Sequence, residues 1–105
     1  MLKTLTDNNF HSEVRESEQP VVILFSGSWC QPCKAYKPIF EKISEHKKTV
    51  MKFMIADMDQ CPVVSSDLVI RSVPSTVMFE NGILRNLKPG TMKLYELREW
   101  IDDSL

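Results

Sequence analysis

Two cysteines three residues apart are the side chains of this chain best placed to do chemistry. Cys30 and Cys33 stand where an apolar segment ends and a helical pattern begins. A cysteine at a helix N-terminus points its sulfur at free backbone N–H groups and at the positive end of the helix dipole, and both stabilise the reactive thiolate. Cys33 comes one helical turn later, so the two sulfurs can close a disulfide. The spacing predicts a redox pair in which Cys30 attacks and the less exposed Cys33 resolves, with Pro32 stiffening the first turn.

A Cys-x-x-Cys pair can also be half of a zinc site or a purely structural disulfide. A zinc site needs two further ligands, and Cys61 with His11 or His46 would supply them only by coincidence of the fold. The three cysteines cannot all pair, which favours a reducing compartment and argues against a structural disulfide. We therefore expect no metal and a cytoplasmic location. We expect Cys61 to be a surface thiol without function, with a regulatory or intermolecular thiol as the alternative.

Length and charge limit the possible classes of protein. The 105 residues suffice for one domain, 1–105, and a content of 43% hydrophobic and 26% charged residues excludes wholesale disorder. Thirteen Lys+Arg oppose fourteen Asp+Glu, so neither nucleic acid nor an anionic membrane surface is expected as a partner. The longest apolar run, Val21 to Phe25, is far shorter than the ~20 residues of a membrane helix. The first fifteen residues also lack the apolar stretch of a secretory signal.

Hydrophobic periodicity defines the elements that must position the cysteine pair. Before residue 72 the patterns predict a short helix with a side-chain cap from residues 6–9 and an end near Pro20, a buried strand at 21–25, a long amphipathic helix from 31 to about 48, a buried strand at 50–58 and a short helix at 62–70. Pro38 lies inside the long helix, where it removes a backbone donor and predicts a kink.

The C-terminal third predicts a hairpin followed by a closing helix. Asn81-Gly82 is a strong two-residue turn signal between strands at 75–80 and 83–87. Leu94, Leu97 and Ile101 share one face of a final helix. The run at 21–25 is continuously apolar, as in strands covered on both faces. Together the elements predict an α/β domain in which a central mixed β-sheet is flanked by helices on both faces.

The segment Phe25-Ser26-Gly27-Ser28-Trp29-Cys30-Gln31-Pro32-Cys33, with Pro38 in the following helix, resembles the thioredoxin family. The similarity continues in order along nearly the whole chain. It includes Ile70-Arg71-Ser72-Val73-Pro74 before the family's cis proline, Phe79-Glu80-Asn81-Gly82 at its hairpin, Gly90 in its substrate-facing loop and Leu97-Arg98-Glu99-Trp100-Ile101 in its closing helix.

This resemblance implies a thioredoxin fold and a thiol–disulfide oxidoreductase that reduces protein disulfides through Cys30 and Cys33. It implies no metal or organic cofactor, electrons from a separate NADPH-dependent thioredoxin reductase, and a monomer. It also implies that Pro74 is cis and that a groove for the substrate's disulfide segment is lined by five residues: Trp29, Pro32, Val73, Pro74 and Gly90. Two alternatives stay open: a binding module that uses the same groove, and an oxidase or isomerase.

Three positions depart from the family pattern. Leu24 stands where the family usually has a buried acid, Ile55 where a lysine commonly accompanies that acid, and Gln31 where a glycine follows the first cysteine. The dithiol is intact, but the usual acceptor for the Cys33 proton is missing. We therefore expect resolution by Cys33 to be slower at neutral pH and to rise with pH.

Overall fold

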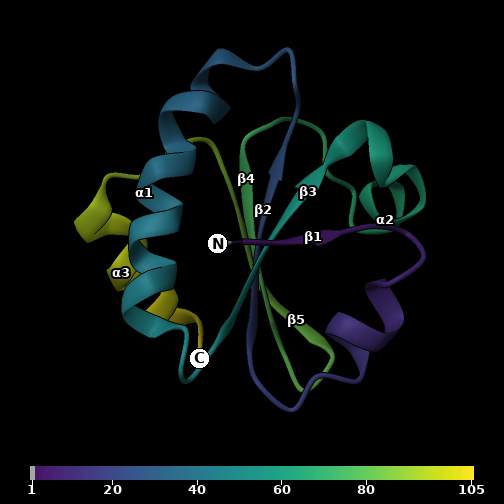
Figure 1. Ribbon diagram of the computed structural model, residues 1–105, viewed down its shortest axis with the longest axis horizontal. Helices are drawn as coiled ribbons and strands as arrows, with labels where there is room; N and C mark the ends of the chain where they lie inside the picture. The colour runs from purple at the N-terminus through teal and green to yellow at the C-terminus, as the bar shows by residue number, and fades with distance from the viewer. Residues whose placement is uncertain (1) are drawn as a thin grey trace.

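The computed structural model describes residues 2–105, which form a five-stranded sheet with helices on both faces (Figure 1). The strands lie in the order β1-β3-β2-β4-β5. β1 (Lys3–Leu5), β3 (Lys52–Asp57) and β2 (Val21–Ser26) run parallel, whereas β4 (Ser75–Glu80) and β5 (Ile83–Pro89) complete an antiparallel half. The predicted α/β class and mixed sheet are confirmed.

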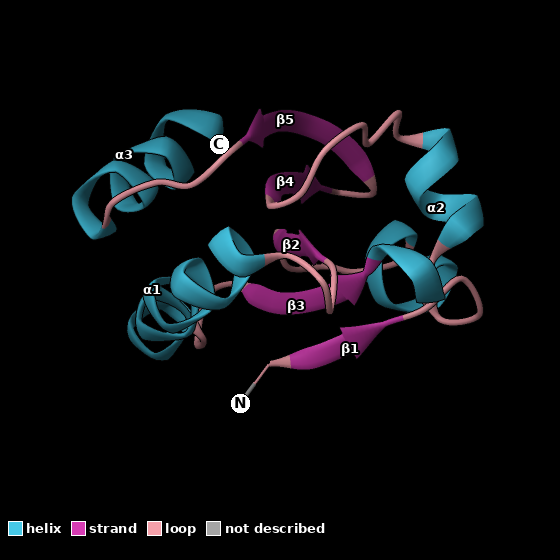
Figure 2. Cartoon of the chain, turned by 90° about the horizontal axis from the view of Figure 1, so that it is seen from above, coloured by secondary structure: helices cyan, strands magenta, loops and turns pink. Residues whose placement is uncertain are grey.

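The helices divide into two groups, one on each side of the sheet (Figure 2). α1 (Gln31–Lys47) and α3 (Leu94–Ser104) cover one face. α2 (Pro62–Asp67), the π-helical turn η1 (His11–Arg15) and the 3₁₀ turn η2 (Met58–Gln60) gather on the other side. In the part of the chain described here, no helix has the length and apolar character needed to cross a bilayer.

Strand β2 lies at the centre, which explains why its sequence is continuously apolar. All of 21–25 is buried, because alternate side chains enter two separate clusters. On the α1/α3 face, Val22 and Leu24 pack with side chains that include Tyr36, Phe40, Phe53 and Leu97. On the opposite face, called the α2 face here, Ile23 and Phe25 pack with side chains that include Leu5, Val14, Cys61 and Val64.

The N-terminal region differs most from the sequence-based prediction. β1 was not predicted, because only three residues pair with β3 and the isolated tripeptide has no clear period. The expected helix is only the turn η1, which ends at Arg15, well before Pro20. No side chain caps η1 at Phe10, but residues 6–9 form a capping pair one turn earlier: the Asn9 side chain accepts the Thr6 N–H at 2.7 Å and the Thr6 hydroxyl accepts the Asn9 N–H at 3.3 Å.

The other predicted elements are present, with shifted ends. Pro38 is accommodated inside α1 without interrupting it. The second strand is shorter than predicted, since Val50 is 59% exposed and β3 begins at Lys52. The hairpin turn is confirmed, with φ of 53° at Asn81 and 75° at Gly82. Gly82 is also required sterically, because a Cβ there would lie 2.4 Å from the Arg15 carbonyl oxygen.

Candidate functional site

The cysteine pair lies at the N-terminal end of α1, as the sequence predicts. Cys30 is the N-cap residue, with φ −95° and ψ 109°, and its Sγ accepts a hydrogen bond from the Cys33 backbone N–H at 3.2 Å. The two residues form a disulfide with their Cα atoms 5.3 Å apart. Cys30 and Cys33 are 4% and 2% exposed, so the second sulfur is the more enclosed one. The helix N-terminus therefore donates directly to Cys30, the thiolate of which it stabilises on reduction.

The segment before the pair presents a large aromatic side chain to solvent. Trp29 is 64% exposed, although the next residue in the loop from β2 to α1, Cys30, is buried. Its indole lies over Gly27, where an added Cβ would come within 2.9 Å of the ring. Pro32 is exposed in the first turn of α1, where its missing donor costs no helical hydrogen bond. The tight approach at Gly27 thus holds Trp29 beside the disulfide.

A second loop reaches the same sulfur from the other side. The Val73–Pro74 peptide bond is cis, as the resemblance implies, and the Val73 carbonyl oxygen lies 3.6 Å from Cys30 Sγ. Gly90 has φ 88° and donates its N–H to the Pro74 carbonyl at 2.8 Å. Val73 therefore contacts Cys30 although it is far from it in sequence, and the hydrogen bond between Gly90 and Pro74 ties a third segment to the same loop.

The floor beneath the pair is apolar at the two positions where the family carries charge. Leu24 is fully buried and pairs in register with Ile55 on β3 and with Thr76 on β4. Close by, a hydrogen bond joins the Tyr36 hydroxyl and Thr76 Oγ1 at 2.8 Å. Burial raises the pKa of Tyr36 to about 12. Among the described residues, the cluster around Leu24 on the α1/α3 face therefore contains no carboxylate.

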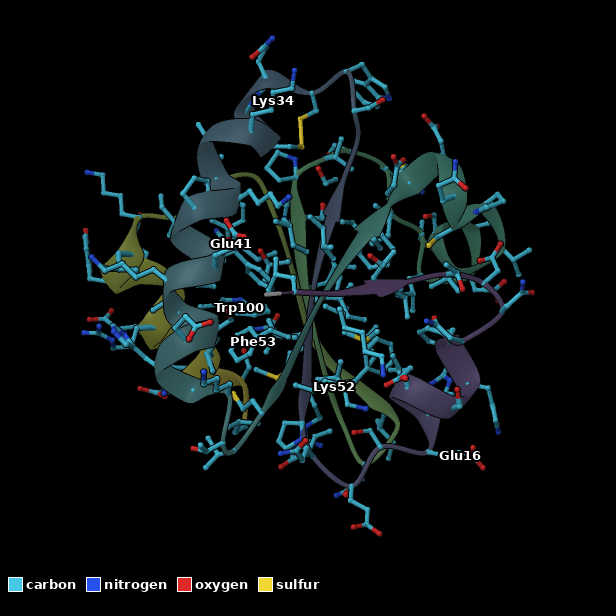
Figure 3. All side chains as sticks on the ribbon, in the orientation of Figure 1. Glu16, Lys34, Glu41, Lys52, Phe53 and Trp100 are labelled. Atoms are coloured by element: carbon cyan, nitrogen blue, oxygen red, sulfur yellow. A yellow bond between two sulfur atoms is a disulfide. The ribbon has the colours of Figure 1, made fainter. Side chains whose placement is uncertain are left out.

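A hollow of about 290 Å³ lies beside Cys33 and was not anticipated from the sequence. It is lined by Thr4, Ser26, Gly27, Ser28, Cys33, Lys34, Lys37, Ile55 and Asp57. Figure 3 shows Lys34 next to the disulfide at the start of α1. Asp57 was not predicted as a site residue, because it stands at the end of a strand. The available signal is its spacing from Ile55, since residues two apart in a strand lie on the same face.

The prediction for Cys61 is wrong. Cys61 is fully buried, and its Sγ donates to the Leu5 carbonyl at 3.1 Å. Burial, reinforced by the charges of Asp7 and Asp57, raises the pKa of Cys61 to about 11. It belongs to the cluster on the α2 face, away from the face covered by α1. The polar residues that precede Cys61 predict an exposed side chain, but the short β1 strand packs over it.

The two histidines that could join Cys61 in a zinc site are both exposed. His11 lies in η1 and His46 near the end of α1, on different elements. Within residues 2–105, no three His, Cys, Asp or Glu side chains gather closely enough to hold a metal ion.

Comparison with known proteins agrees with this geometry. A family model described as Thioredoxin matches residues 1–103. A thioredoxin of Rickettsia felis is 36% identical over 105 residues, covering 100% of both chains, and one of Rickettsia prowazekii is 35% identical with the same coverage. "Thioredoxin C-2" of Corynebacterium nephridii is 31% identical over 100 residues, 95% of this chain and 93% of that protein. With its fold, its disulfide at the start of α1 and these full-length similarities, the chain belongs to the thioredoxin family.

Proposed function

We propose that this protein reduces disulfides in other proteins, with Cys30 as the attacking and Cys33 as the resolving cysteine. The observation that carries the proposal is the Cys30–Cys33 disulfide at the N-terminus of α1, where the Cys33 N–H donates to Cys30 Sγ. That donor and the helix dipole stabilise negative charge on Cys30 after reduction. Cys33 has no comparable position, because it lies one turn inside the helix and is only 2% exposed.

The reaction proceeds in two exchanges. The Cys30 thiolate attacks one sulfur of the substrate disulfide, forming a mixed disulfide and releasing the other substrate sulfur as a thiolate. Cys33 then loses its proton and attacks Cys30 Sγ. The Cys30–Cys33 bond forms, the bond from Cys30 to the substrate breaks, and the substrate leaves fully reduced. The protein is left in the oxidised form that the structure holds.

The substrate segment is proposed to lie across Cys30, between the Trp29 loop and the loop of Val73, Pro74 and Gly90. The exposed indole of Trp29 and the exposed ring of Pro32 offer apolar contact on one side. On the other side the Val73 backbone can pair with an extended peptide as an added strand. The proximity of the Val73 carbonyl to Cys30 Sγ, 3.6 Å, supports this arrangement.

Thioredoxins as a family act on disulfide-containing proteins and are returned to the dithiol state by a reductase. For this chain we propose a monomer of the cytoplasm that uses an NADPH-dependent thioredoxin reductase and needs no cofactor of its own. A binding module that uses the same groove is the second candidate, and the observation that favours it is the absence of a carboxylate at Leu24. Low turnover would not matter for such a module. An oxidase or isomerase of the same fold is the third.

An insulin reduction assay with NADPH and a supplied thioredoxin reductase separates these candidates. We expect catalytic reduction by the wild type, loss of activity in Cys30→Ser, and a trapped mixed disulfide in Cys33→Ser. Cys61→Ser is the matched control, because this third cysteine is buried on the other face and should be dispensable. Stoichiometric binding without turnover would favour the binding module. The redox potential of the pair then separates a reductant from an oxidant.

A further inference from the structure

The replacement of the family's acid by Leu24 leaves the question of which group receives the Cys33 proton. Cys33 is 2% exposed, so bulk water reaches its sulfur only through an opening in the protein. The hollow lined by Cys33 is such an opening. Its volume, about 290 Å³, accommodates several water molecules at roughly 30 Å³ each. Its rim includes Ser28, Lys34 and Lys37, which are exposed, so the hollow connects Cys33 with solvent.

Asp57 is the acidic side chain that lines this hollow. Side chains alternate along β3, and Phe53 and Ile55 pack on the α1/α3 face, so Asp57 points to that face as well. Asp57 also pairs in register with Ser26, the last residue of β2 before the loop that leads to Cys30. The carboxylate therefore lies at the end of the sheet nearest the dithiol, two residues beyond Ile55.

The carboxylate of Asp57 is held in place from one side only. Its Oδ1 accepts the backbone N–H of Asp59 at 2.9 Å, as the N-cap of η2. Within residues 2–105 no other hydrogen bond or ion pair of Asp57 occurs, so Oδ2 is available to water in the hollow. This half-buried acid is fixed by one oxygen and lines the same hollow as the thiol.

The positive charges that line the hollow favour ionisation of the Cys33 thiol. Lys34 and Lys37 line the hollow from α1, and their positive charge stabilises a thiolate that forms on Cys33. Further titratable groups that interact with Asp57 are Asp59 on η2 and Cys61, and Asp7 acts on the same Cys61 thiol. Cys61 packs on the α2 face and stays protonated at neutral pH, because burial raises its pKa to about 11.

From this geometry we propose that Asp57 is the proton acceptor for Cys33 during resolution, acting through water in the hollow and replacing the acid that Leu24 displaces. The inference rests on the proposed function, because only a turnover through a mixed disulfide requires Cys33 to lose its proton.

In the proposed step the Cys33 Sγ–H proton passes through water to the Asp57 carboxylate as Cys33 Sγ attacks Cys30 Sγ. The Cys33–Cys30 bond forms and the bond between Cys30 and the substrate sulfur breaks. Cys30 and Cys33 are together oxidised, and the substrate sulfur is reduced and leaves as a thiolate. Asp57 then returns the proton to solvent, from which the substrate thiolate is protonated.

The test follows the two exchanges separately by stopped flow. Reduced protein is mixed with an excess of an aromatic disulfide that releases a coloured thiolate. The first thiolate reports attack by Cys30, at a rate that depends on reagent concentration, and the second reports resolution by Cys33, at a rate that does not. We expect Asp57→Asn to leave the first phase unchanged and to slow the second about tenfold at pH 7. The deficit should shrink as pH rises, because hydroxide replaces the missing acceptor.

Asp59→Asn is the matched control, since it removes the same charge from an exposed neighbour that does not line the hollow. Asn at position 57 can still accept the Asp59 N–H, which preserves the turn. Asp57→Glu keeps a carboxylate at the hollow and should retain most of the wild-type second phase. It also provides an answer should Asp57→Asn fail to fold.

Three results would overturn the proposal. The first is a second-phase rate in Asp57→Asn that equals or exceeds the wild-type rate. That result is expected if the negative charge of Asp57 only hinders ionisation of the neighbouring thiol. The second is a slowing that is the same at every pH, which indicates a purely structural role. The third is an equal slowing in Asp59→Asn. A wild type that shows no concentration-dependent first phase would instead overturn the proposed function, so the two failures are distinguishable.

Discussion

The two faces of the sheet each contain cysteine, and the same side chain has opposite properties on them. On the α1/α3 side, Cys30 caps a 17-residue helix and accepts a backbone N–H from Cys33. On the α2 face, Cys61 is the donor, giving its hydrogen bond to the Leu5 carbonyl in a fully buried site. Both sulfurs lie near a carbonyl, Val73 for Cys30 and Leu5 for Cys61, but Cys30 Sγ also accepts an N–H at the positive end of the helix dipole, whereas Cys61 is near the charges of Asp7 and Asp57.

The comparison indicates that the local electrostatic environment of each cysteine sets the reactivity of its thiol. Both Cys30 and Cys61 have little exposed surface, 4% and 0%, so exposure alone does not separate them. What separates them is that a backbone N–H at a helix start donates to Cys30 Sγ, whereas Cys61 Sγ is itself the donor to the Leu5 carbonyl. A donated bond stabilises the thiolate, whereas an accepted one stabilises the thiol.

Alkylation of the fully reduced protein gives the largest expected contrast between the faces. At pH 7 iodoacetamide should modify Cys30 first and leave Cys61 unmodified until the protein unfolds. A thiol with a pKa of about 11 is only about 10⁻⁴ ionised at pH 7, and its burial lowers the rate further. Peptide mapping by mass spectrometry after timed quenching provides the measurement. Faster modification of Cys33 or Cys61 would show that the assignment of roles is wrong.

Leu24→Asp tests what the α1/α3 face gains by being apolar. The change places a carboxylate in a fully buried site between Ile55 and Thr76, so the free energy of unfolding at pH 7 should fall by about 3 kcal/mol or more. The new acid should also accept the Cys33 proton, so disulfide reduction at pH 7 should become faster. Urea denaturation and the second stopped-flow phase measure the two effects.

Leu24→Asn is the control for that experiment. It removes the same apolar packing and buries a polar group of the same shape, but it supplies no proton acceptor. We expect comparable destabilisation without the gain in rate. An unchanged rate in Leu24→Asp would contradict the expected gain and would show that a second carboxylate adds nothing to the transfer of the Cys33 proton to Asp57.

Alkaline pH should weaken the α2 face through Cys61. Its pKa is raised in the folded protein from 9.0 to about 11, so the buried thiol contributes stability that is fully present below pH 9 and is lost as pH rises toward 11. Cys61→Ser keeps a donor for the Leu5 carbonyl but does not titrate in this range. The variant should therefore lose less stability between pH 9 and 11, by about 2 kcal/mol at most.

Tyr36 on the opposite face makes the comparison with wild type necessary. Its pKa is also raised, to about 12, so wild type and variant share its contribution to alkaline unfolding. The difference between their unfolding curves isolates Cys61. Parallel curves for the two proteins across this pH range would show that the buried thiol is not responsible.

The sequence predicts the α1/α3 side of the molecule better than the α2 side. α1 and β2 have hydrophobic patterns that extend over the whole element, and the hairpin has a strong turn signal. Each of the three lies where its pattern predicts. The cysteine pair and its order of burial follow from position at a helix start. The α2 face is assembled from a three-residue strand, a five-residue turn and a six-residue helix, which are too short for periodicity to define.

Residues that depend on tertiary contacts escaped prediction for the same physical reason. Burial of Cys61 depends on β1, which is 56 residues away in sequence. The position of Asp57 beside Cys33 depends on the register of β2 with β3. The hydrogen bond between the Tyr36 and Thr76 hydroxyls joins residues 40 apart. No short sequence pattern predicts these contacts, because each joins segments that are distant along the chain. The two cysteines of the dithiol, by contrast, are only three residues apart.

The end of α2 carries a strain that the α1/α3 face lacks, and it gives the smallest expected effect. Val69 follows the helix with φ 57°, which is unfavourable for a β-branched residue by about 1–2 kcal/mol. The chain closes there in the pattern of a glycine-terminated helix. The N–H of Ile70 bonds to the Ser65 carbonyl at 2.9 Å, and that of Val69 to the Ser66 carbonyl at 3.1 Å. This conformation explains why α2 stops at Asp67 although the sequence predicts a helix to residue 70.

Val69→Gly should therefore raise the free energy of unfolding by about 0.5–1 kcal/mol, since relief of the strain exceeds the added entropy of the unfolded chain. Val63→Gly is the matched control, because Val63 is 60% exposed and Val69 57%, but Val63 has ordinary helical geometry inside α2. That control should lose about 0.5–1 kcal/mol. Equal destabilisation of both variants in urea would show that the Val69 side chain makes contacts worth more than its strained backbone costs.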